Sequence, residues 1–66
     1  MKGKAMNIEM GTLQSGDWCQ VQWFNSTMPM YKEATACGNG VIMVGEDGKR
    51  RWFCKNTLVT PIKKPA

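Results

Sequence analysis

Short apolar-rich runs separated by turn residues mark the second half of the chain, a pattern that is typical of strands, and residues 49–54 also alternate between apolar and polar. Residues 40–45, GVIMVG, are rich in β-branched side chains and have the length of one strand. Asn39-Gly40 precedes them and Asp47-Gly48 follows them, and both pairs tolerate the positive φ of tight hairpin loops. The stretch 34–61 therefore predicts an antiparallel meander.

The first half of the chain predicts one strong strand and a loop. Cys19, Val21 and Trp23 alternate with glutamines within 17–24, so we expect these three side chains on the core face. Residues 25–30 predict a loop, because Pro29 disfavours a helix at the residue before it.

Residues 31–37 predict the second strand, with Ala34 and Ala36 pointing inward. A helix across 30–37 is the rival interpretation, since Lys, Glu and Ala are good helix formers. The glycine-rich turn that follows directly favours the strand.

The end of the meander predicts a strand at 49–54, a single 3-10 turn at 56–58 and a closing strand at 59–62. We expect Phe53 and Leu58 in the core, with Arg51 on the side of Phe53 but nearer the rim. Period two then places Arg50, Trp52 and Cys54 on the opposite face.

A chain of 66 residues predicts one domain. We expect an N-terminal arm at 1–15, with a short edge strand at 8–10, a compact unit at 16–62 and a mobile basic tail at 63–66. No apolar run is long enough for a membrane span, and no apolar segment follows the basic start as in a secretory signal. We therefore expect a cytoplasmic protein, and a core this small is compatible with a homodimer.

The net charge of +4 is confined to the second half of the chain. Residues 1–33 carry three lysines and three acids, whereas residues 34–66 carry six cations and two acids. A cationic surface of this kind favours an anionic partner.

The composition offers little to an enzyme. The chain has no histidine, and its carboxylates show no pairing suited to acid–base chemistry. Cys19, Cys37 and Cys54 are widely spaced and odd in number, which argues against a disulfide framework, and a zinc site usually has a close cysteine pair and often histidine. We therefore expect packed thiols, no metal and no cofactor. The chain is predicted to be non-enzymatic.

The predicted order of strands and turns resembles the SH3-like small β-barrels, which include Tudor and KOW-type modules and the C-terminal domains of retroviral integrases. The resemblance covers about 16–62 and is carried by Gly16-Asp17, Ala34-Thr35-Ala36, residues 40–44, Asp47-Gly48, Phe53, Leu58 and Pro61. It implies an all-β, five-stranded barrel with a one-turn 3-10 helix before the last strand. The short basic chain also resembles products of phage or mobile-element genes.

Two binding functions follow, and the sequence leaves both open. Members of the SH3-like folds often bind DNA or RNA, and here basic and aromatic side chains interleave on one strand. The predicted nucleic-acid contacts are Lys49, Arg50, Arg51, Trp52 and Lys55. The alternative is a protein partner, held in a Tudor-like aromatic site or on the Met-Pro-Met segment. The predicted partner contacts are Trp18, Phe24, Met28, Met30 and Tyr31.

Overall fold

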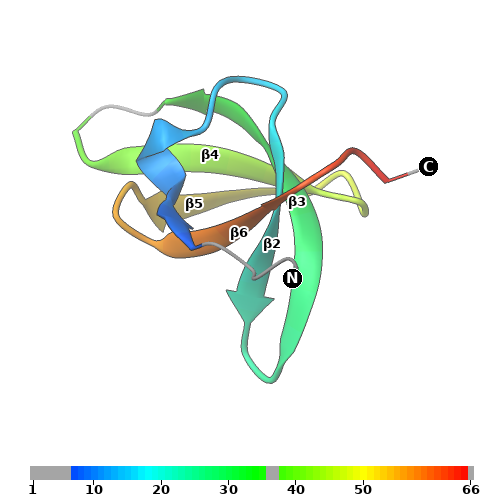
Figure 1. The fold of residues 1–66 in the computed structure, drawn as a ribbon. Helices are drawn as coiled ribbons and strands as arrows, with labels where there is room; N and C mark the ends of the chain where they lie inside the picture. Colours follow the sequence, from blue (N-terminus) through cyan, green and yellow to red (C-terminus); the bar gives the residue numbers. More distant parts are fainter. Residues whose placement is uncertain (1–6, 36–37, 66) are drawn as a thin grey trace.

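The computed structural model describes residues 7–35 and 38–65, which form one six-stranded antiparallel sheet. The elements are β1 (Ile8–Glu9), the 3-10 turn η1 (Met10–Thr12), β2 (Trp18–Trp23), β3 (Ser26–Thr35), β4 (Gly40–Gly45), β5 (Arg50–Cys54) and β6 (Leu58–Ile62). The strand order is β1-β6-β2-β3-β4-β5, and the sheet curls with η1 lying across it (Figure 1). The all-β prediction is confirmed.

The sheet is not closed into a barrel, which corrects the five-stranded barrel predicted from the sequence. β1 and β5 are its two edges. The additional strand is β1, the short edge strand expected near residue 8, which pairs with β6 through Ile8 and Val59. η1 instead bonds to the turn between β5 and β6. Met10 N donates to Thr57 O at 2.8 Å, and Gly11 N donates to Lys55 O at 2.7 Å.

The 3-10 turn lies near the start of the chain and not before the last strand, so its predicted position was wrong. Leu58 already belongs to β6 as the partner of Glu9, which leaves only a tight turn closed by Thr57 N donating to Cys54 O at 3.0 Å. η1 is instead held by Leu13 N donating to Met10 O at 3.1 Å, and by Thr12 Oγ1 donating to Glu9 O at 2.7 Å.

The loop predicted at 25–30 is also wrong, because Ser26–Met30 forms the first half of β3. The hairpin turns at Phe24-Asn25, and β2 and β3 project from the rest of the sheet (Figure 1). β4 begins to pair with β3 only at Met30, so at Pro29 the strand has a neighbour on one side alone. A proline without an N–H is tolerated on such an edge. The rival helix is excluded over 30–35, and Ala36 and Cys37 lie outside the described residues.

The core occupies one side of the sheet, which we call the inner face. Met10, Met30 and Met43 are fully buried there. Cys19 and Val21 join them as the period predicted, while Trp23 and Phe53 are half-buried. Unbranched thioether side chains fill irregular gaps, which suits a sheet this strongly curved. The opposite side is the outer face.

Two core predictions fail, and each failure has a local cause. Leu58 is 60% exposed, because the turn after Cys54 resets the alternation and places Val59 inward instead. Ala34 is exposed, because the β3–β4 register shifts between Lys32 and Ala34. A bulge adds one residue to one strand, and every later side chain then changes face.

Lys32 is a charged residue on the inner face. It is almost completely buried, and its Nζ donates to the carbonyl oxygen of Leu13 at 2.6 Å. The aliphatic stem packs like an apolar side chain while the ammonium satisfies a backbone acceptor. Lys32 thus ties the segment after η1 to the middle of the sheet.

Candidate functional site

The two faces of β5 differ as the sequence predicted. Arg50, Trp52 and Cys54 are exposed on the outer face, whereas Arg51 and Phe53 are half-buried on the inner face. Trp52 is 54% exposed, which is unusual for so large an apolar ring in a small protein. The outer face of β5 is therefore the candidate binding surface.

The Trp52 ring has a built support. Its indole nitrogen lies so close above Gly40 that any Cβ at that position would overlap it. Asn39 accepts a hydrogen bond from Lys55 N at 2.7 Å, which holds the start of β4 against the end of β5. Gly40 is therefore needed for close approach, and the indole rests on the backbone as a fixed platform with its remaining surface in solvent.

Arg50 stands beside this platform in a two-pronged ion pair. Its Nε and Nη2 donate to the two carboxylate oxygens of Glu33 at 2.7 and 2.9 Å. This hydrogen bonding lowers the pKa of the Glu33 carboxyl and raises the pKa of Arg50. The Arg50 side chain remains 67% exposed, so the guanidinium edge that faces away from Glu33 can still donate to an anion.

Arg51 does not share this surface. Its Nη2 donates to Asp47 Oδ2 at 3.0 Å, and its guanidinium carbon lies 5.1 Å from the centre of the Trp23 ring. The hydrogen bond from Arg51 is the main reason that the pKa of Asp47 is lowered. Arg51 therefore contacts residues away from the outer face, and it is not part of the candidate site.

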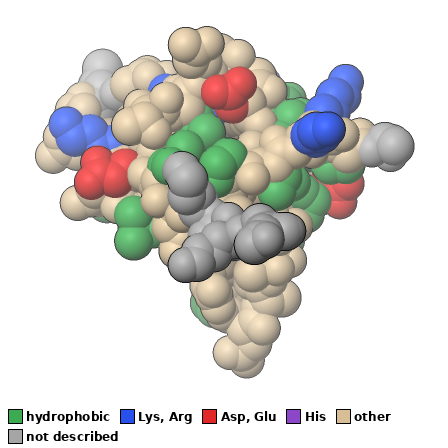
Figure 2. Space-filling model, viewed as in Figure 1, with side chains coloured by type: hydrophobic (Ala, Val, Ile, Leu, Met, Phe, Trp, Pro, Cys, Tyr) green, Lys and Arg blue, Asp and Glu red, His purple; other side chains and the backbone are tan. Residues whose placement is uncertain are grey.

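Lys49 and Lys55 lie at the two ends of β5, and both are exposed. They are six positions apart, which is about 20 Å along an extended strand. On the side of the molecule that η1 covers, Lys and Arg side chains lie at the margins with hydrophobic side chains between them (Figure 2). Lys49 and Lys55 flank β5, and the Cβ of Lys55 lies so close to Gly11 of η1 that a Cβ on that glycine would overlap it. Together with Arg50 and Trp52 they form the candidate site.

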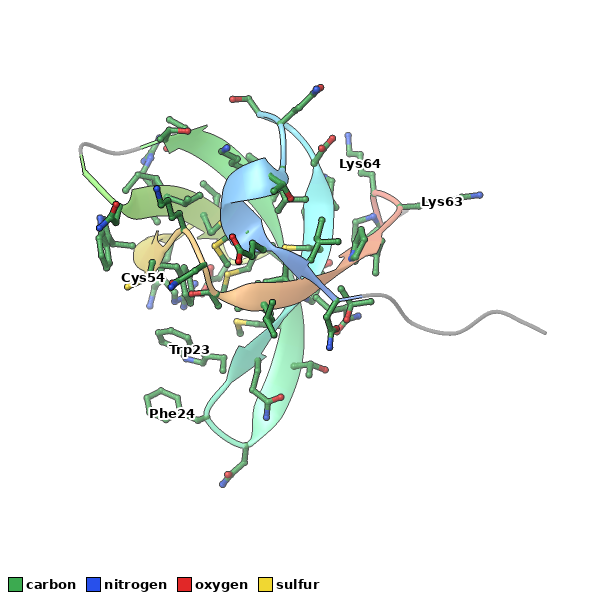
Figure 3. All side chains as sticks on the ribbon, turned by 60° about the vertical axis from the view of Figure 1, so that its left-hand side comes forward. Trp23, Phe24, Cys54, Lys63 and Lys64 are labelled. Atoms are coloured by element: carbon green, nitrogen blue, oxygen red, sulfur yellow. The ribbon has the colours of Figure 1, made fainter. Side chains whose placement is uncertain are left out.

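The predicted partner contacts do not form one cage. Trp18 and Tyr31 pair on the outer face, with ring centres 5.0 Å apart. Phe24 lies at the tip of the β2–β3 hairpin, beside Trp23 at 5.1 Å (Figure 3). Met30 is fully buried and Met28 packs against the core, so the Met-Pro-Met segment is not a free docking surface.

The remaining chemistry of the described residues is sparse. Burial raises the pKa of the Cys19 thiol to about 11, while Cys54 is exposed on β5. Within residues 7–35 and 38–65, His, Cys, Asp and Glu side chains gather nowhere in a group that could hold a metal ion. In the same ranges no helix has the length and apolar character needed to cross a membrane.

No protein-family model matches the chain, and no curated protein or solved structure is significantly similar to it. The function must therefore be argued from the geometry of its own residues.

Sequence reasoning missed two residues of the site. Gly40 was predicted as a turn residue at the start of a strand, and its support of Trp52 was missed. Glu33 was predicted only as part of a strand, although it restrains Arg50 from 17 residues away. A contact of that kind depends on the β3–β4–β5 register, and no local pattern encodes it.

Proposed function

We propose that this protein is a non-enzymatic nucleic-acid-binding module that uses the outer face of β5. The observation that carries the proposal is Trp52, a largely exposed indole fixed on Gly40 with Arg50 beside it and a lysine at each end of the strand. A base stacks on the indole, while Lys49, Arg50 and Lys55 contact phosphates. Stacking of this kind is worth about 1–3 kcal/mol per base.

We further propose that the sheet is an open variant of the SH3-like fold. The support is the strand order: β2 to β5 form a meander, and β6 returns to lie beside β2. This likeness concerns architecture alone, and the binding function rests on the β5 site.

A salt-dependent titration with fluorescent oligonucleotides tests the function. Three phosphate contacts on a single strand predict that log K falls with log salt at a slope of about −2. Trp52→Ala should lower the affinity by at least about fivefold at low salt, because stacking on the indole is lost.

Phe24→Ala is the matched control, because it removes another exposed aromatic ring, which lies at the tip of the β2–β3 hairpin. Its affinity should equal that of the wild type. An affinity that ignores salt, or an equal loss in the two variants, would reject the β5 site.

A protein partner is the second candidate, favoured by the hairpin tip. Phe24 is 83% exposed and has a φ of 56°, a conformation that is uncommon for a bulky residue. An apolar ring held outward at such a position fits a complementary apolar pocket on another protein. Capture from a nuclease-treated lysate that Phe24→Ser abolishes and Trp52→Ala leaves intact would favour this candidate over the first.

A further inference from the structure

A second aromatic feature lies on the outer face, away from β5. Gly16, Trp18, Tyr31 and Lys64 line a recess of about 340 Å³. The two rings are tilted at 47° to each other, with their centres 5.0 Å apart. The proposed β5 site leaves this recess unexplained.

The local backbone keeps the recess open. Gly16 has a φ of 95°, and a Cβ built there would meet nothing within 4 Å. Gly16 N donates to Lys32 O at 2.8 Å, so the turn is fixed against β3. A residue without a side chain thus leaves the aromatic wall uncovered at the point where β2 begins.

The recess and the β5 site belong to one surface. Trp18 pairs with Tyr31, Tyr31 with Val44, and Val44 with Arg50. Directly paired residues of neighbouring strands point to the same side of a sheet. Tyr31 and Arg50 are therefore two strand spacings apart on the outer face, which is roughly 10 Å. A ligand that leaves the β5 site across the strands meets Tyr31 next.

The chemistry of the lining selects the ligand. Two aromatic rings offer stacking surfaces to a flat ring, and Lys64 supplies a positive charge at the same place. None of the four lining residues is acidic, so a methylated lysine or arginine would meet a like charge with no counter-ion. A base with its phosphate satisfies both features.

We infer that the recess takes an unpaired base of the same strand that occupies β5, with Lys64 on its phosphate. This inference rests on the proposed function and restricts it to single-stranded nucleic acid. Stacking requires bases whose faces are free, and in a duplex those faces are covered. The one helical segment among the described residues has three residues, too few to read a major groove. The bound strand crosses β4 and β3 between Trp52 and Trp18.

Indole N–H signals in a nitrogen-15 NMR titration test the inference, because the chain has three tryptophans. The probes are a hexathymidine, an RNA hexamer and a short duplex, with signals assigned from Trp→Phe variants. The hexamers should shift the signals of Trp18 and Trp52. Trp23 packs against Phe53 on the inner face and should not move. The duplex should bind more weakly and leave Trp18 unchanged.

The other outcomes separate the inference from the function. A shift at Trp52 alone would overturn the recess and leave the β5 site standing. A shift at Trp18 alone would overturn the β5 site and the continuous strand. No binding would overturn both, and equal shifts at all three indoles would mean a general change of structure and would also overturn the inference.

A pair of lysine variants provides the second measurement. Lys63 and Lys64 are neighbours whose side chains point in different directions at the end of β6, and only Lys64 lines the recess (Figure 3). Lys64→Ala should reduce the salt slope by about 0.7 and shrink the Trp18 shift. Lys63→Ala should leave the Trp18 shift unchanged. Equal effects of the two variants would contradict a specific contact by Lys64.

Discussion

Cationic and aromatic residues differ in exposure between the two faces of the sheet. On the inner face, Arg51 is covered, bonded to Asp47 and placed against Trp23, and Lys32 is buried with its ammonium on a backbone carbonyl. On the outer face, Trp52 stands largely in solvent and Arg50 keeps most of its side chain exposed. Adjacent arginines on β5 therefore have different roles: one completes the structure and the other remains available to a ligand.

This difference shows that a run of cations in a sequence overstates a binding surface. Residues 49–51 read Lys-Arg-Arg, yet the alternation of β5 directs Arg51 to the inner face, and Lys49 lies outside the strand. The remaining cations form a candidate site because they flank the indole of Trp52, which rests on Gly40.

Truncation of the buried methionine Met43 should destabilise the protein far more than truncation of Trp52. Met43→Ala leaves a cavity in the core and should lower the free energy of unfolding by about 2–5 kcal/mol. Trp52→Ala removes a ring that is mostly in solvent and should cost clearly less. Urea denaturation of the two variants measures both values. Equal losses would mean that the two faces do not differ in packing.

Removal of the Lys32 ammonium should destabilise the protein while removal of an exposed ammonium should not. Lys32→Met keeps the buried stem but leaves the Leu13 carbonyl without its donor, which costs about 1–3 kcal/mol. Lys49→Met is the control, because Lys49 is exposed. The same denaturation experiment checks the pair, and a Lys32 variant as stable as the control would show that its hydrogen bond contributes nothing.

We expect the protein to lose stability at alkaline pH, because the thiol of Cys19 is buried. Its pKa is raised from 9.0 to about 11 in the folded state, so the unfolded state releases its proton first. Stability from this group is complete below about pH 9 and falls as pH rises toward 11, with a limiting slope of roughly 1.4 kcal/mol per pH unit. Denaturation between pH 8 and 11 should show a shallower fall for Cys19→Ala, since only other groups then titrate. Parallel curves for wild type and variant would contradict the burial of a neutral thiol.

Release of Arg50 should strengthen binding slightly. Glu33→Gln removes the carboxylate that competes with phosphate and should raise the affinity for a single-stranded oligonucleotide by about two- to fivefold at low salt, the range of an exposed ion pair. Glu9→Gln, which removes an exposed acid on the edge strand β1, is the charge-matched control. An equal gain in both variants would point to net charge alone.

The meander and its second hairpin could be predicted from the sequence because their signals are local, whereas the positive φ expected at Asn39-Gly40 occurs at Gly38 instead. Asp47-Gly48 and the β-branched run before it needed no distant partner to be recognised. The open sheet, the length of β3 and the place of η1 could not be predicted in this way. η1 depends on hydrogen bonds to Lys55 and Thr57, and Pro29 is accommodated in β3 because β4 ends beside Met30.

For the candidate site, too, only the features encoded locally could be predicted from the sequence. Strand periodicity predicted that Arg50 and Trp52 share the exposed face and that Arg51 does not. The support from Gly40, the restraint by Glu33 and the burial of Met30 arise from register and packing between distant segments. Residue type alone therefore predicted some contacts that the fold makes inaccessible, such as Met30. It missed the contacts made by Gly40 and Glu33, which depend on the fold.

Alkylation of cysteines with and without oligonucleotide tests the central claim most directly. Cys54 lies exposed two residues from Trp52 on the same face, and Cys19 is buried with a raised pKa. With iodoacetamide at pH 8 and mapping of the modified peptides, a saturating single-stranded hexamer should slow alkylation of Cys54 severalfold, and Cys19 should stay unmodified throughout. Cys54 that reacts at the same rate with the oligonucleotide bound would show that nucleic acid does not occupy the outer face of β5.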